Sequence, residues 1–104
     1  QEVQFFETTF SRDFNTHSVF YDEHLNVLIL KNSIDSLKYT FLDKYIVREK
    51  DTFQIEISNK KLFLDGNLIK EKTIDAIEMT LSSSFANRQL FIQQRMDAAY
   101  YINN

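Results

Sequence analysis

The single glycine of the chain, Gly66, restricts the fold more than any other residue. It follows Asp65 and lies between two apolar runs, in a sequence of 104 residues that contains no proline. A two-residue hairpin turn requires positive φ at its central positions, which glycine adopts without steric cost and aspartate tolerates. We therefore predict a β-hairpin with Asp65 and Gly66 at its turn. The predicted register pairs Leu64 with Asn67, Phe63 with Leu68 and Leu62 with Ile69.

Alternating apolar and polar residues predict a strand before this hairpin. Residues 52–58 alternate with period two, which places Phe53 and Ile55 on one face and Gln54 and Glu56 on the other. This pattern is typical of a strand with one buried face.

Three further segments are rich in β-forming residues. Residues 18–21 and 25–31 are apolar runs separated by three polar residues, a spacing that predicts a second hairpin. Residues 3–10 are dense in Phe, Thr and Val and lack helix-capping signals, so we predict a strand there as well.

Two segments fit both a helix and strands. Residues 37–50 form either two strands with a turn at Asp43 and Lys44 or one helix, and their content of Tyr, Thr, Phe, Ile and Val favours strands. Residues 74–81 form either a short separate helix or a final strand.

The last third of the chain is richer in Ala, Met, Gln and Arg. Its apolar residues Phe85, Ile92 and Met96 follow helical steps, and a serine at position 82, 83 or 84 provides an N-cap. We predict a helix over residues 84–101.

Together these segments predict a single α+β domain over residues 1–104, β-rich in 1–72 and mainly helical in 73–104. The expected architecture is an antiparallel β-meander of about five to seven strands, forming a curved sheet or a partly open barrel, packed against a C-terminal amphipathic helix. Ten Phe and five Tyr supply a core rich in aromatic rings.

The charge distribution argues against a nucleic-acid partner. The net charge is −3, and summing the charged residues gives −4 for residues 1–36, +2 for 37–72 and −1 for the remainder. Neutralising phosphates requires a concentrated basic face, which this mild asymmetry does not provide.

Residues suited to catalysis or metal binding are sparse. There is no cysteine, and the two histidines, His17 and His24, flank Asp22 at a spacing that matches no standard metal site. The sequence has no Gly-x-Ser-x-Gly nucleophile motif. We therefore expect no enzyme activity, no catalytic residue, no metal and no cofactor.

Two adjacent aromatic pairs are the candidate partner-binding residues: Phe5 with Phe6, and Tyr100 with Tyr101. Neighbouring residues on a strand point to opposite faces, so one phenylalanine of the first pair is expected at the surface. We therefore expect a small binding module that docks a protein partner, or a second copy, through a sheet edge or an aromatic patch.

The alternative function is a carrier of a small apolar ligand or lipid headgroup in a cavity between the curved sheet and the helix. The expected lining residues are Phe14, Phe20, Phe41 and Phe53.

The sequence leaves the compartment open. Residue 1 is Gln rather than Met, which fits a secreted or periplasmic chain released by signal cleavage as well as a domain boundary. No run approaches the ~18 consecutive apolar residues of a membrane span, so we expect a soluble chain.

Overall fold

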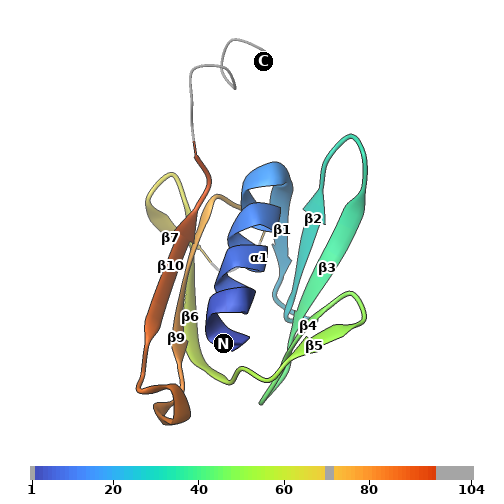
Figure 1. Cartoon of the computed structure of the whole chain (residues 1–104). Coiled ribbons are helices and arrows are strands. Elements are labelled where there is room, and N and C mark those ends of the chain that lie inside the picture. Colours follow the sequence, from blue (N-terminus) through green and yellow to red (C-terminus); the bar gives the residue numbers. More distant parts are fainter. Residues whose placement is uncertain (1, 70–71, 96–104) are drawn as a thin grey trace.

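The computed structural model describes residues 2–69 and 72–95, which form a helix followed by antiparallel strands in two sheets (Figure 1). The helix is α1 (Glu2–Thr16), and a short 3₁₀ helix, η1 (Ser83–Phe85), precedes the last of the described strands. The strands are β1 (Ser18–Asp22), β2 (Val27–Lys31), β3 (Ser36–Phe41), β4 (Ile46–Arg48), β5 (Asp51–Phe53), β6 (Ile57–Leu64), β7 (Asn67–Ile69), β8 (Lys72–Ile74), β9 (Ala76–Leu81) and β10 (Gln89–Gln93). The α+β class is confirmed, but the predicted C-terminal helix is not present among the described residues, and the α-helix they contain lies at residues 2–16.

The predicted single curved sheet or partly open barrel is wrong, because the strands divide into two sheets that share one core. Sheet A has the order β5-β4-β3-β2-β1-β8, and sheet B has the order β10-β9-β6-β7. Asp75 separates β8 from β9, so the chain passes from one sheet to the other at this residue.

The prediction of a strand over residues 3–10 is wrong, because these residues belong to α1. The buried residues of α1 recur at steps of three and four, as Val3, Phe6, Thr9, Phe10, Asp13 and Phe14. That spacing places them on one face of a helix. Burial of this face outweighs the β preference of Phe, Thr and Val, since most helix stability in proteins comes from tertiary packing.

Helix α1 lies between the two sheets and contacts both of them (Figure 1). On the sheet B side, Arg88 Nη2 lies 3.2 Å from Glu7 Oε1, and the Arg95 N–H donates to Asn15 Oδ1 at 2.7 Å. On the sheet A side, the N–H of Gln54, directly after β5, donates to the Glu2 carboxylate at 2.8 Å. The helix therefore runs beside two strands that end their sheets, β10 and β5.

The predicted helix over residues 84–101 is also wrong where the chain is described. Residues 89–93 form strand β10, which pairs antiparallel with β9. Leu90 and Ile92 are buried while Gln89, Phe91 and Gln93 are exposed, which is a two-residue rather than a helical period. Ser82 does occupy the N-cap position, but of the short η1, and its side chain makes no capping hydrogen bond.

The hairpin at Gly66 is confirmed in position and register. Leu64 pairs with Asn67, Phe63 with Leu68 and Leu62 with Ile69. Both turn residues have positive φ, 54° at Asp65 and 83° at Gly66, as a two-residue turn of this kind requires.

Of the other strand predictions, those for residues 18–31, 37–50 and 74–81 are largely confirmed, and the one for residues 52–58 is not. The hairpin between β1 and β2 forms, with its turn at residues 23–26. Residues 37–50 form β3 and β4 around a turn, and residues 76–81 form β9. The single strand predicted over residues 52–58 is wrong, because its ends belong to β5 in sheet A and β6 in sheet B and residues 54–56 link the two sheets. Phe53 and Ile55 are nevertheless buried and Gln54 is exposed, as predicted.

The core between helix and sheets is filled largely by aromatic rings. The Phe10 ring lies 5.4 Å from the ring of Phe6 and 4.9 Å from that of Tyr39 in sheet A, measured between centroids. The Phe6 ring lies 5.1 Å from that of Phe53. These contacts join α1 to β3 and β5 within one cluster that also includes the inward residues of sheet B.

Candidate functional site

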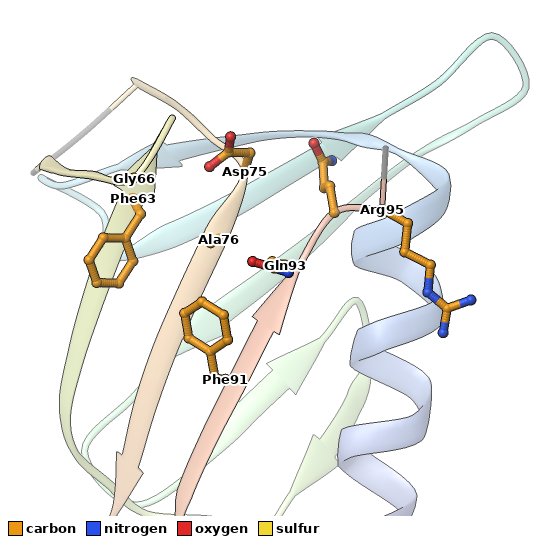
Figure 2. Close-up of a pocket in the computed structure, with 8 residues that line it drawn as sticks. Phe63, Gly66, Asp75, Ala76, Phe91, Gln93 and Arg95 are labelled. Carbon is orange, nitrogen blue, oxygen red and sulfur yellow. The ribbon is translucent and has the colours of Figure 1, made fainter. Parts of the chain in front are cut away.

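The outer face of sheet B carries two aromatic residues that the core does not use. Leu62, Ile77 and Ile92 lie opposite one another on β6, β9 and β10 and are all buried. Successive side chains alternate between the faces of a sheet, so Phe63 and Phe91 point outward. Figure 2 shows both rings on the same face of the sheet.

The two rings border a hollow of about 640 Å³. Their centroids are 6.3 Å apart with an interplanar angle of 64°, an edge-to-face arrangement, and Phe91 is 55% exposed. Ala76, on the strand between them, also lines the hollow. Its side chain is a single methyl group, which leaves space beside the two rings. We call Phe63, Ala76 and Phe91 the Phe63–Phe91 surface.

Polar groups of both charges surround this surface. Asp75 and Arg95 line the same hollow, and Figure 2 shows them on different sides of it. Asp75 is held in place by its Oδ2, which accepts the N–H of Asp65 at 3.1 Å. On the same face of the sheet, Lys61 Nζ lies 4.0 Å from Glu78 Oε1. An apolar centre with a polar rim is the usual anatomy of a protein-binding patch.

The structure separates the two phenylalanines that the sequence singled out. Phe5 is 65% exposed and Phe6 is fully buried. The expected difference in exposure is present, but it arises from a helix, where neighbours differ by about 100°, and not from a strand. Tyr100 and Tyr101 lie outside the described residues.

Phe5 lines a second hollow, of about 570 Å³, between α1 and the hairpin formed by β4 and β5. Its ring rests against Phe53, with centroids 5.9 Å apart. The rest of this hollow is strongly charged, and includes Arg12, Arg48 and Asp51. It therefore lacks the apolar centre of the Phe63–Phe91 surface.

The four rings expected to line a ligand cavity do not lie together. Phe14, Phe41 and Phe53 are buried in the core. Phe20 is 43% exposed and alternates with the buried Val19 and Tyr21 along β1, which places it on the outer face of sheet A.

The buried carboxylate of Asp13 joins α1 to sheet A. The sequence patterns did not predict this residue. Tyr39 Oη donates to Asp13 Oδ2 at 2.7 Å, and Arg48 Nε donates to the same oxygen at 2.6 Å. Arg12 Nη2 approaches Oδ1 at 3.3 Å. Asp13 is 3% exposed. The signal that could have identified it is one acid on the apolar face of a helix, a pattern that appears only once residues 2–16 are read as helical.

The environment of Asp13 lowers its pKa. Burial alone would raise the pKa, but hydrogen bonds from Arg48 and Tyr39 and the charges of Arg48 and Arg12 outweigh it. In turn, burial and the hydrogen bond to Asp13 raise the pKa of the Tyr39 hydroxyl, and the same carboxylate raises the pKa of Arg48. The cluster is therefore an ionised acid with two arginines and a neutral phenol.

The two histidines do not assemble a metal site with Asp22. His17 Nε2 lies 2.7 Å from Asp35 Oδ1, and His17 Nδ1 lies 2.8 Å from the carbonyl oxygen of Asp13. Asp22 instead accepts the N–H of Leu25 in the turn after β1. Among residues 2–69 and 72–95, no three His, Cys, Asp or Glu residues are arranged to hold a metal ion.

The described part of the chain also contains no helix of the length and apolar character needed to cross a membrane. Comparison with protein-family models, with curated proteins and with solved structures finds no match. The case for function therefore depends on the surfaces described above.

Proposed function

We propose that this protein is a binding module that docks a protein partner over the Phe63–Phe91 surface. The observation that carries the proposal is the edge-to-face pair of Phe63 and Phe91 on the outer face of sheet B, next to a hollow of about 640 Å³. Exposed aromatic residues next to a pocket are typical anchors of protein interfaces.

The position of the rings favours docking on the face of sheet B over pairing at its β10 edge. Helix α1 runs beside β10, with contacts at Glu7 and at Asn15. A strand added at that edge would compete with the helix for space. The outer face of sheet B bears no such covering among the described residues, since Phe91 is more than half exposed.

The composition of the surface favours an apolar protein segment as the occupant. The rings provide an apolar centre, while Asp75 and Arg95 place one negative and one positive group beside it. A segment with an aliphatic or aromatic side chain fits this centre, and its backbone and flanking polar groups match the mixed rim. Loss of one buried aromatic anchor typically costs about 2 kcal/mol or more of binding free energy.

Selection from a library of displayed random peptides tests this assignment. Peptides enriched on the wild-type protein are then measured by titration against the variants Phe91→Ser and Ala76→Leu. Both substitutions are expected to weaken binding at least tenfold, the first by removing an anchor and the second by filling the hollow. Thermal unfolding of each variant verifies that it is folded.

Two matched variants locate the site. Phe5→Ser and Phe20→Ser remove exposed rings from α1 and from sheet A, and both are expected to leave the affinity unchanged. Binding that is lost in Phe5→Ser but kept in Phe91→Ser would place the site in the hollow beside α1 and refute the proposal. Failure to enrich any peptide that distinguishes wild type from Phe91→Ser would refute it as well.

A further inference from the structure

A lysine lies between the two sheets, away from the Phe63–Phe91 surface. Lys60 is on β6 opposite Met79, which is fully buried, so its side chain starts from the inner face of sheet B. The neighbouring Lys61 pairs with Glu78 on the outer face. Lys60 is therefore the basic residue of β6 that enters the space between the sheets.

The ammonium group of Lys60 reaches two aromatic rings of sheet A. Its Nζ lies 5.3 Å from the ring centroid of Tyr21 and 5.1 Å from that of Phe41. Both rings are almost fully buried. Tyr21 is held in place by a hydrogen bond from its hydroxyl to Asn26 Oδ1, and Asn26 Nδ2 donates to the carbonyl oxygen of Phe41. The two rings thus form a rigid wall beside the amine.

A hollow of about 290 Å³ gives access to this amine. Lys60 lines it together with Tyr21, and the apolar part of its wall comes from Leu62, Leu68 and Ile69. Charged side chains in the hollow besides Lys60 are Glu23 and Lys61. The volume suits a molecule of the size of a substituted benzene ring, at the lower limit of ordinary ligand pockets.

We propose that Lys60 is a covalent binding site for small apolar aldehydes, which it captures as a protonated imine. This site is separate from the proposed docking surface, and neither proposal depends on the other.

The chemistry follows from the surroundings of the amine. Burial lowers the pKa of Lys60, which increases the fraction of neutral amine at a given pH. The Nζ lone pair attacks the carbonyl carbon, the carbonyl oxygen leaves as water with both amine protons, and a solvent proton then binds the imine nitrogen. The product keeps a positive charge beside Tyr21 and Phe41, where cation–π attraction stabilises it. The apolar wall excludes strongly hydrated aldehydes.

Reductive trapping tests the proposal on the wild-type protein. Benzaldehyde and cyanoborohydride are added at pH 7.5, hydride reduces any imine to a stable benzylamine, and peptide mass spectrometry reads the extent of labelling at each lysine. Lys60 is expected to be labelled several-fold faster than Lys38 or Lys44, two exposed lysines outside this hollow that serve as internal controls. Labelling of Lys60 at or below the rate of Lys44 would overturn the proposal.

Two further conditions show whether the reactivity of Lys60 depends on the folded structure or only on its neighbours in the sequence. In concentrated urea, Lys60 and Lys61 are expected to react equally, because the preference depends on the packed rings. As the pH rises toward the ordinary lysine value of about 10.4, the preference is expected to decrease, because lysines in general become neutral there. A preference that persists in urea, or one that grows with pH, contradicts a site built by the fold.

Discussion

At the scale of single residues, Asp13 contributes to the fold in a way that its neighbours do not. It is an ionised group in the middle of an aromatic cluster, and it is satisfied by Tyr39 and Arg48 from two strands of sheet A. A buried charge is tolerated only when it is paired and hydrogen-bonded. The cluster therefore fixes the angular position of α1, since rotating the helix would leave the carboxylate without donors.

Asp13→Asn is expected to lower the free energy of unfolding at pH 7 by about 2 kcal/mol, because charge-assisted hydrogen bonds become neutral ones and Arg48 loses its counterion. Urea denaturation of wild type and variant measures the difference. Asp51→Asn, an exposed acid on β5, is the matched control and is expected to change the stability little.

The pH dependence of this difference gives the same prediction a second readout. The folded-state pKa of Asp13 is lowered, so its contribution is fully present above the ordinary value of 3.8 and is lost as the pH falls through the folded pKa. The stability gap between wild type and Asp13→Asn should therefore close below about pH 4. A gap that stays constant down to pH 2 would show that Asp13 does not act through its charge.

At the scale of elements, the local sequence predicted the hairpins, whereas long-range packing determines the secondary structure of α1 and β10. The turn at Asp65 and Gly66 depends on backbone angles that two residues impose by themselves, and its register is as predicted. Helix α1 has no such turn residue, and the helical spacing of Val3, Phe6, Phe10 and Phe14 competes with a composition that favours strands. Its residues prefer strands in isolation, and only burial against both sheets makes the helix stable. The reverse holds for β10, where helix-forming composition concealed the alternation around Leu90 and Ile92.

The sequence predicted that the site would be an aromatic patch, but it did not predict the residues Phe63 and Phe91. The sequence predicted an exposed aromatic patch that includes Phe5. Phe5 is exposed, but it lies on α1 and not on the Phe63–Phe91 surface. The pair Phe63 and Phe91 comes together because β6 and β10 flank the same strand, β9. Residues 28 positions apart in sequence cannot be placed side by side without knowing that β10 exists.

Substitutions at Phe5 and Phe6 test the face of α1 directly. Phe6→Ala is expected to cost about 3–5 kcal/mol, because it leaves a cavity beside Phe10 and Phe53. Phe5→Ala is expected to cost less than about 1 kcal/mol, since its ring is mostly in water. Chemical denaturation compares the two, and equal losses would contradict the buried position of Phe6 and the exposed position of Phe5.

The turn between β6 and β7 is tested by Gly66→Ala. A methyl group at this position meets no atom within 4 Å, so the cost comes only from the backbone angle, φ +83°. We expect a loss of about 1 kcal/mol in thermal or chemical unfolding. Gly66→Asn should cost less, because asparagine tolerates positive φ. A larger loss with Asn than with Ala would indicate a contact and not backbone strain.

At the scale of the whole molecule, α1 makes two sheets into one cooperative unit. Its rings reach Tyr39 in sheet A, and its polar side chains bind Arg88 and the backbone of Arg95 next to β10. Near the end of the helix, Gln94 Nε2 donates to the carbonyl oxygens of Phe14 and His17, and Asn32 Nδ2 donates to that of Thr16. Segments from both sheets therefore satisfy the last carbonyls of α1.

Phe10→Ala is accordingly expected to weaken both sheets together, by about 3–5 kcal/mol. Native-state hydrogen exchange measures this loss of stability at each backbone amide. Protection of the amides of β3 and of β9 should fall by the same free energy, since both strands open only when the whole molecule unfolds. A loss confined to β3 would mean that sheet B is stable without the helix.

The contact between α1 and the ends of β10 also limits when this fold can be completed during translation. Glu7 and Asn15 leave the ribosome some eighty residues before their partners Arg88 and Arg95. Until β10 is added, the nascent chain leaves open the part of α1 that β10 contacts and the edge of β9 that β10 pairs with, and both surfaces favour aggregation. A delay in synthesising β10 would therefore increase misfolding more than an equal delay within the hairpins of sheet A, whose partners are adjacent in sequence.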